Sequence, residues 1–521
     1  MKKNKYVYVI LAFFLAGGIP SCSLIDKDPV SEIAPDDFFK NSKDANAFMA
    51  GIYNSLQETL RSNYFDWGEV RSDNVLNAGT GTAQEKLLNN ILAGNDNDLN
   101  AITNWSNLYR SISLCNYAIQ TFPDLIARNV DASEAQYKDQ LGQAYALRGL
   151  LYFYALRVWG GTPIVNDVIV NVNQQLSYPR ATVAQMKTQI LRDIDNALLT
   201  IGSSTTSKFY IQRGGVFALK TDVHMWFQEY PQAIQASNNL TGYSYITTPS
   251  QWKQIFTTPE GSNETIFNMF WNSVEAGNRG VAVCQKLGSL GNTSQYRIAP
   301  KVVEPYYNRF NTGTTKKSDA RLWLSIDTVL YPTLDIYANA AGNVIQYGKF
   351  MDVSPVTGRF AYITQQECSV KVPIYRFADV MLLRAEALAR TFSFQQALNI
   401  VNAIRSRVGY NVQAVLTDYT GTQEQIAIAI QRTVLQERQL ELIGEGKRWF
   451  DLCRIGRTYD YTLNGYDFLR EVMNPILIAR GSEAVAFNSD LNMGRILYPI
   501  NSDVINANPL LKGKQNPPYS E

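Results

Sequence analysis

Two glutamates in the segment ERQLELIGEGKRWFDL have a spacing that could support acid–base chemistry. Glu437 and Glu441 lie four residues apart, so on a helix their Cβ atoms are separated by roughly 6 Å. Glycoside hydrolases use carboxylate pairs at comparable distances. Two carboxylates on one helix project side by side, however, and do not reach opposite sides of a bond. Arg438 and Arg448 are near enough in sequence to neutralise them. We therefore interpret the segment as structural, and the apolar residues expected in the core are Trp449, Phe450 and Leu452.

The chain contains a single histidine, His224. That count excludes most zinc sites and every Ser-His or Cys-His nucleophile pair except one centred on His224. The stretch ALKTDVHMWFQEY has a helical pattern without a serine or cysteine partner, so we expect a packed helical histidine. No EF-hand spacing is present, and we predict no metal and no cofactor.

The cysteines after residue 22 are far apart and form no CxxC motif. At this low density in a long chain we expect small buried apolar side chains and not a disulfide framework. These residues are Cys115, Cys284, Cys368 and Cys453.

Residues 1–21 have the features of a secretory signal peptide, with three lysines in the first five positions and an uncharged, mostly apolar run over residues 6–19. The run is too short for a membrane-spanning helix, which needs ~20 apolar residues. Cleavage before Cys22 would make this cysteine an acylated N-terminus. Ordinary secretion with cleavage near Gly18 remains an alternative, since Pro20 is unusual in a lipobox.

Composition argues against a nucleic-acid-binding protein. Without its leader the chain has 45 Lys and Arg against 46 Asp and Glu, and it contains no long basic run or zinc-finger spacing. Some 500 residues exceed the usual limit of about 250–300 for one core, so several cores or a repeat architecture are expected. The 30 tyrosines and 8 tryptophans suit either a large core or a platform for a ligand.

Helical periodicity dominates the chain. Leu147, Leu151, Tyr154 and Val158 recur at the spacing of one helix face, and a Gly-Gly pair at 160–161 ends that pattern. An irregular stretch from about 244 to 372 holds most of the strand-like and turn-rich pieces. Further helical patterns cover residues 42–60, 105–122, 183–199, 213–228, 231–240, 379–391, 395–407 and 423–443.

Two places have a helix-turn-helix pattern of tetratricopeptide type. Ala385 and Ala397 lie twelve residues apart, with Phe394 three residues before the second alanine. Thr221, Tyr230 and Ala233 repeat this spacing. Since about 160 residues separate the two copies, the pattern favours stacked helical pairs with a large insertion between them.

Eight segments follow one another along the chain. They are CSLIDKDP from Cys22, WSNLYRSISLCNYAI from Trp105, AYALRGLLYFYALRVWGGTPIV from Ala144, YPRATVAQMKTQILRDIDNAL from Tyr178, VPIYRFADVMLLRAEALAR from Val372, ALNIVNAIRSRVG from Ala397, LQERQLELIGEGKRWFDLCRIG from Leu435 and LYPINSDVINANPLLKGKQNPPY from Leu497. In this order they resemble the SusD/RagB family, surface lipoproteins of Bacteroidetes that partner SusC-type TonB-dependent transporters. The resemblance covers nearly everything after residue 21.

The resemblance implies an all-α fold, a tetratricopeptide-like helical-pair scaffold with a large loop-rich insertion. We expect a signal peptide over 1–21, an N-terminal portion with tether and helical repeats over 22–240, and a C-terminal portion over 241–521, packed as one globular unit. Lipidation is expected at Cys22, where the family carries its lipid, placing the protein at the outer membrane and facing outward.

The resemblance also implies that the protein is a receptor and not an enzyme. It would bind a nutrient, most often an oligosaccharide, and hand it to a SusC-like TonB-dependent transporter. A peptide-binding RagB-like receptor, a helical-repeat scaffold for proteins and a surface glycoside hydrolase remain as alternatives.

In this family the early loops and the insertion form the face that meets ligand and transporter. A sugar stacks its apolar CH face on aromatic rings and pairs its hydroxyls with polar side chains. Our candidates for these roles are Tyr64, Trp67, Asp73, Asn74, Trp271, Asn272, Gln295, Tyr296, Arg297 and Trp323, among which Trp271, Tyr296 and Arg297 are preferred.

Overall fold

The computed structural model describes most of the chain after residue 38. The described residues are 39–61, 63–77, 81–168, 176–202, 206–275, 281–288, 295–299, 301–303, 319–326, 347–352, 356, 360–361, 363–364, 367–410, 412–455 and 467–521. The predicted signal peptide and Cys22 lie outside the described residues.

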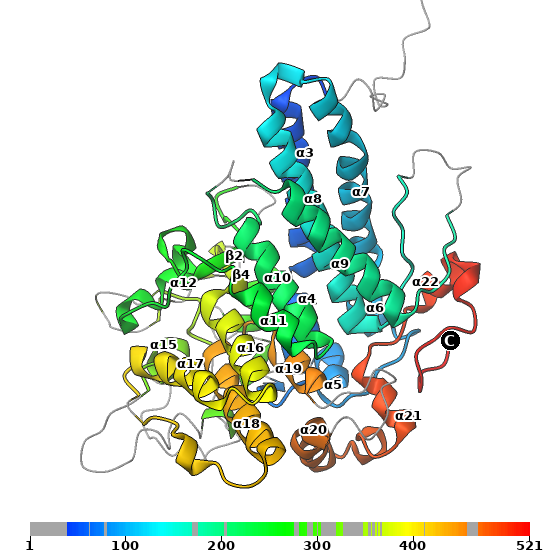
Figure 1. Ribbon diagram of the computed structural model, residues 1–521. Coiled ribbons are helices and arrows are strands. Elements are labelled where there is room, and N and C mark those ends of the chain that lie inside the picture. Colours follow the sequence, from blue (N-terminus) through cyan, green and yellow to red (C-terminus); the bar gives the residue numbers. More distant parts are fainter. Residues whose placement is uncertain are drawn as a thin grey trace, which may run out of the picture.

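Four long helices form the upper part of the molecule (Figure 1). Helix α7 packs against α3 and α8, and α8 packs against α9. Asn41 and Asp44 form a capping box at the start of α3, and Thr182 and Gln185 form one at α9. The bounds are α3 (Ser42–Leu60), α7 (Ser106–Ala127), α8 (Glu134–Trp159) and α9 (Val183–Thr200).

Helix α8 is buried on nearly every side along its C-terminal half, from Ala146 to Trp159. The sequence pattern predicted one buried face of α8, which is only part of the buried surface of this helix. Neighbouring helices on both sides cover its other faces. The helix ends at Gly160, which has a φ of 77° that favours glycine over other residues.

The two tetratricopeptide-like patterns form helical pairs as predicted, and the pairs stack on each other. Helix α11 packs against α16 although the insertion separates them in sequence. A small apolar cluster of Met225, Ala233, Leu383 and Ala387 fills this contact. Helix α18 packs against both α16 and α17. The helices are α10 (Arg213–Trp226), α11 (Tyr230–Ser237), α16 (Phe377–Arg390), α17 (Phe394–Arg407) and α18 (Gln423–Leu442).

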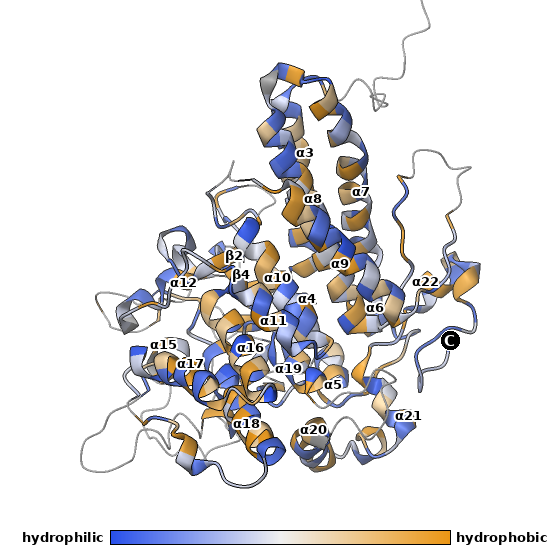
Figure 2. Ribbon diagram, in the orientation of Figure 1, coloured by the Kyte–Doolittle hydropathy of each residue, from blue (hydrophilic) through white to orange (hydrophobic). Residues whose placement is uncertain are grey.

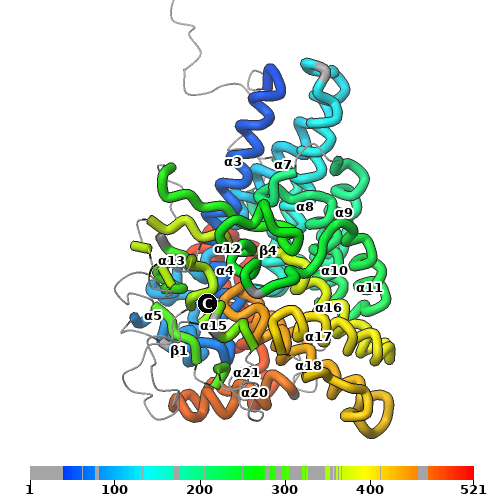
Figure 3. Tube along the Cα trace, turned by 90° about the vertical axis from the view of Figure 1, so that its left-hand side faces the viewer, coloured from blue at the N-terminus to red at the C-terminus, as the bar shows by residue number. Residues whose placement is uncertain are grey.

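The insertion contributes short elements, most of which lie away from α9 and α11 (Figure 3). Two antiparallel two-stranded sheets tie it to the scaffold. Strand β1 (Val75–Asn77) pairs with β3 (Tyr296–Ile298), and β2 (Thr265–Met269) pairs with β4 (Val372–Arg376). Among the described residues, the helices of the insertion include α12 (Gln254–Thr257), α13 (Val281–Leu287) and α15 (Arg321–Ser325).

Shorter helices complete the structure, and one apolar core cluster contains residues from Phe39 to Leu511. Hydrophobic and hydrophilic residues alternate along the surrounding helices (Figure 2), as expected where one side of a helix faces the core.

The π-helical turn η1 (Asp66–Val70) packs against α19, and a Cβ on Gly68 would lie only 1.9 Å from the carbonyl oxygen of Gly446. The remaining helices are α4 (Asn63–Phe65), α5 (Thr82–Leu88), α6 (Asn100–Thr103), α19 (Arg448–Arg454), α20 (Asp467–Ala479), α21 (Asp490–Met493) and α22 (Ser502–Ala507).

A disulfide joins Cys284 of α13 to Cys368, just before β4. The expectation that these cysteines are not part of a disulfide was wrong, because the insertion brings two residues 84 positions apart to a Cα separation of 6.0 Å. Cys115 and Cys453 are buried, as expected. None of the described helices combines the length and apolar character needed to cross a membrane.

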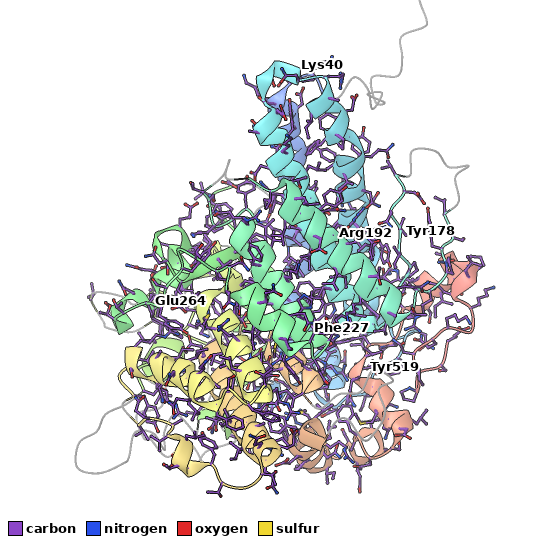
Figure 4. The ribbon with its side chains drawn as sticks, viewed as in Figure 1. Lys40, Tyr178, Arg192, Phe227, Glu264 and Tyr519 are labelled. Carbon is purple, nitrogen blue, oxygen red and sulfur yellow. A yellow bond between two sulfur atoms is a disulfide. The ribbon has the colours of Figure 1, made fainter. Side chains whose placement is uncertain are left out.

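A buried cluster of charged side chains connects the insertion to α17 and α18. Glu441 accepts hydrogen bonds from Arg321 (2.9 Å) and Arg376 (2.6 Å) and also pairs with Arg407. Burial raises the pKa of Glu441, but the three arginines outweigh it and hold that pKa well below its ordinary value. In the described part of the chain, the ion pairs of this cluster join five cations, Arg321, Lys349, Arg376, Arg405 and Arg407, to five anions, Glu264 (labelled in Figure 4), Asp319, Glu437, Glu441 and Glu445.

The pairing partners of the glutamates differ from those predicted. Arg438 pairs with Asp379 and Asp451, and Arg448 pairs with Asp73. The ion pairs of Glu437 and Glu441 are made with Arg321, Arg376, Arg405 and Arg407. The structural interpretation of the segment nevertheless agrees with the structure. Trp449, Phe450 and Leu452 are buried, and neither glutamate is exposed to a substrate.

Candidate functional site

An aromatic groove lies between α3 and β2. Its cavity measures about 350 Å³, within the usual range for small-ligand sites. Four aromatic residues on its wall are partly exposed, while Phe267 at its base is buried. We call this feature the aromatic groove, and its part-exposed rings are Tyr53, Phe209, Tyr210 and Phe270.

Tyr53 holds one wall of the groove in place. Its hydroxyl donates to Gln143 Oε1 (2.8 Å) and accepts from the backbone N–H of Ile211 (3.0 Å). The ring contacts Tyr210 edge to face, with centroids 4.7 Å apart. Burial raises the pKa of Tyr53 well above its ordinary value, so the hydroxyl stays protonated and keeps donating. The two tyrosines therefore form a fixed wall.

A second part of the wall consists of Phe209 and Phe270, whose ring centroids are 4.7 Å apart. The Nζ of Lys371 lies 4.5 Å from the centroid of Phe270. The ammonium donates to the carbonyl oxygens of Trp271 and Ser369. Ser369 also accepts from the backbone N–H of Ser273 (3.0 Å). The segment after β2 is thus attached to the chain beside the disulfide.

Polar side chains border the aromatic groove. Asn54 and Gln57 extend from α3, and the exposed Glu275 extends from the segment after β2. The side-chain amide of Asn272 donates to Glu275 Oε1 (3.0 Å). Part-exposed rings with amide and carboxylate groups at the edge are the combination that binds sugars, by stacking and by hydrogen bonds to hydroxyls.

The structure places most of the predicted aromatic residues in the core. Tyr64, Trp67, Trp271 and Tyr296 are each no more than 3% exposed. Trp67 donates its indole N–H to the Ile102 carbonyl oxygen, and Tyr296 donates its hydroxyl to Asp66. A ring covered on both faces has no surface on which a sugar can stack. We therefore correct the expectation that these four rings form a stacking platform in this structure.

Asp73 and Asn74 have structural partners. Asp73 accepts two hydrogen bonds from Arg448, at 2.8 and 2.9 Å. The buried Asn74 donates to Glu69 (2.7 Å) and accepts from Gln439 (2.9 Å). Burial raises the pKa of Asp73, but Arg448 more than offsets this, and the net pKa is lowered. Both side chains attach the early loop to α18 and α19.

The early loop and the insertion do meet, as the resemblance implied. In the β1–β3 sheet, Leu76 is opposite Arg297. Lys286 of the insertion forms two 2.9 Å hydrogen bonds to Asp66 of η1. Arg297 of β3 and the adjacent Gln295 are partly exposed. Asn272 instead contacts Glu275 at the edge of the aromatic groove. The backbone of Trp323 is part of α15, and its side chain is not among those that the structure describes.

The residues of the aromatic groove were missed by sequence reasoning, although the segment IFNMFWNSVEAGNRG was singled out. Within it the preferred ring was Trp271, which is buried, whereas its neighbour Phe270 is partly exposed. The sequence feature that could have indicated the groove is the aromatic pair at 209–210, which follows a turn-rich stretch. In the part of the chain that the structure describes, no three His, Cys, Asp or Glu side chains are placed to hold a metal ion.

Comparisons with known proteins agree with this architecture. Residues 286–519 match the model of the SusD family, and residues 25–218 match a family described as starch-binding associating with outer membrane. SusD-like protein P38 of Formosa agariphila is 27% identical, with 100% of both chains covered. SusD-like protein P2 of the same organism is 23% identical over 87% of this chain and 91% of its own.

Solved structures share the fold. A SusD superfamily protein from Bacteroides thetaiotaomicron has a TM-score of 0.68 at 22% identity, covering 92% of this chain and 100% of its own. NanU of B. fragilis has a TM-score of 0.67 at 21% identity, covering 95% of this chain and 100% of its own. The helical-pair scaffold, the two family models in order along the chain and the full-length curated relatives together show that the chain belongs to the SusD/RagB family.

Proposed function

We propose that this nutrient-binding protein of SusD type binds an oligosaccharide in the aromatic groove and delivers it to a SusC-like TonB-dependent transporter. The observation that carries the proposal is the set of four part-exposed rings bordered by amide and carboxylate groups. The description of the matching N-terminal family as starch-binding supports a carbohydrate as the ligand class. Binding and release need no covalent step, and we propose that the protein is not an enzyme.

The proposed location follows from the same family. Acylation of Cys22 would attach the chain to the outer membrane, facing outward, and the lipid of a lipoprotein has more than one chain, which suffices for stable anchoring. The association with the outer membrane in the name of the matching family supports this placement.

Loss of one groove ring is expected to weaken glycan binding roughly tenfold or more, because burying an aromatic side chain contributes about 1.5–3 kcal/mol. The variants are Tyr210→Ala and Phe270→Ala, titrated calorimetrically as soluble protein beginning after Cys22 with host, plant and fungal oligosaccharides and with a peptide pool. Phe392→Ala removes a 45% exposed ring outside the groove and serves as the matched control. Equal glycan affinity in all three variants would refute the groove as the binding site. Binding heat observed only with peptides would refute an oligosaccharide as the ligand.

Gentle detergent extraction tests the transporter. We expect the tagged full-length protein to co-purify with a TonB-dependent barrel at equal stoichiometry, because delivery requires a stable contact between receptor and transporter. Cys22→Ala should move the protein from the membrane to the soluble fraction while groove binding persists. Purification of the wild-type lipoprotein without a barrel would contradict the proposed partnership.

A further inference from the structure

Phe270, one of the part-exposed rings of the aromatic groove, is the first residue beyond the β2–β4 sheet. The register of the two strands ends at the pair Met269 and Val372. The side chain that follows, Trp271, is buried, whereas the ring of Phe270 is partly exposed at the groove. The backbone on the C-terminal side of Phe270 is therefore held by contacts outside the sheet.

The short segment before β4 supplies such contacts. The ammonium group of Lys371 donates to the carbonyl oxygen of Trp271. The half-buried hydroxyl of Ser369 accepts from the backbone N–H of Ser273 (3.0 Å) and lies 2.9 Å from the Oγ atom of Ser273. Two residues of this segment thus bind the chain directly after Phe270, on the side where the strand pairing has ended.

The disulfide fixes the position of the same segment. Cys368 directly precedes Ser369, and its partner Cys284 belongs to α13. Helix α13 is itself attached to the scaffold, because Lys286 donates to both carboxylate oxygens of the buried Asp66 in η1, at 2.9 Å each. The covalent bond therefore relates the position of Ser369 to that of the early loop.

The disulfide and Ser369 also act on the two ends of one stretch of chain. Ser273 near its beginning is bonded to Ser369, and Cys284 at its end is bonded to the adjacent Cys368. A chain that is fixed at one end has fewer conformations to lose when its other end is bound. Without the disulfide, the hydrogen bond between Ser273 and Ser369 is opposed by a larger loss of conformational entropy, and it is formed in fewer molecules.

We propose that the Cys284–Cys368 disulfide and Ser369 position Phe270 for ligand binding, so that the aromatic groove has its full glycan affinity only in the oxidised protein. This proposal rests on the proposed function of the groove as a glycan site. When fewer molecules hold the ligand-competent conformation, the apparent dissociation constant rises in proportion. Loss of one hydrogen bond of ordinary strength corresponds to about a fivefold change.

Hydrogen exchange measured by mass spectrometry tests the attachment without a ligand. The soluble wild-type protein is compared with Ser369→Ala and with the double variant Cys284→Ala with Cys368→Ala, each at a temperature where circular dichroism shows it to be folded. Exchange of the backbone amides in residues 271–275 should accelerate about fivefold in both variants. Ser369→Thr keeps the hydroxyl and should restore the wild-type rate. Unchanged exchange in both variants would overturn the positioning.

Glycan retention on the immobilised soluble protein tests the consequence for binding. One pool of plant, fungal and host oligosaccharides is applied, and the glycans bound by the groove are those whose retention is lost in Phe270→Ala. Their retention per folded molecule should fall about fivefold in Ser369→Ala and at least as much in the double cysteine variant. Ser369→Thr should restore it, which a general loss of stability would not explain.

Two variants serve as matched controls. Ser489→Ala removes a hydroxyl that accepts a backbone N–H at the start of α21 (3.2 Å), and Cys115→Ala removes a buried thiol outside the disulfide. Neither should change the Phe270-dependent retention. Unaltered retention in both Ser369→Ala and the double cysteine variant would overturn the positioning while leaving the groove as the glycan site. Absence of any Phe270-dependent retention in the wild-type protein would overturn both proposals.

Discussion

Glu441→Gln is expected to lower the free energy of unfolding by about 3–5 kcal/mol, the cost of removing one partner from a buried ion pair. The glutamate lies between Arg321, Arg376 and Arg407, and none of these side chains is more than slightly exposed. An amide has no charge to balance the three guanidinium groups. Denaturant unfolding followed by circular dichroism measures the difference.

Glu471→Gln is the matched control for this variant. It removes the same charge from a pair with Arg432 in which both side chains are about half exposed, and such pairs contribute about 0.2–1 kcal/mol. Because the pKa of Glu441 is lowered in the folded state, its stabilisation is present at neutral pH and is lost only as the pH falls below the ordinary carboxyl range. A Glu441→Gln protein as stable as Glu471→Gln would refute the importance of the cluster.

Removal of the disulfide by Cys284→Ala with Cys368→Ala is expected to cost about 4–5 kcal/mol in the chain-entropy treatment, given the 84-residue separation of the cysteines. Reduction of the wild-type protein should produce a similar loss, and the double variant should not respond to reductant. Thermal and denaturant unfolding with and without reductant measure both effects.

Cys115→Ala provides the matched control, because it alters a buried thiol outside the disulfide. Burial raises the pKa of Cys115 to about 12, which keeps it a protonated thiol. Its unfolding should shift less and should remain sensitive to reductant through the intact disulfide. If reductant changes nothing in the wild type, the disulfide does not stabilise the folded chain.

The helices could be predicted from the sequence because their determinants are local. The apolar spacing and the capping residues of α3 and α9 lie within or next to each helix. Ion-pair partners could not be predicted in this way. Glu437 pairs with Arg321 and Arg405, while Arg438 beside it in sequence pairs elsewhere, since three-dimensional proximity decides between equivalent charges.

The aromatic groove could not be predicted from the sequence either. Its rings come from α3, from the turn at 209–210 and from the end of β2. Strand β2 is buried at all five positions, so it lacks the alternation that would separate an exposed ring from a buried one. Trp271 was preferred as a ligand contact because its ring is large. A large ring is as readily buried in the core as exposed to a ligand.

The stacking of α11 on α16 constrains the order in which the chain can fold. Helices α3 to α9 find their partners among near neighbours in sequence, and such short-range contacts form early. The apolar side chains of Met225 and Ala233 cannot be covered by Leu383 and Ala387 until the whole insertion has been synthesised. Until then this surface is exposed and prone to aggregation. The chain therefore has its greatest need of a chaperone after α11 has been synthesised and before α16 has been synthesised.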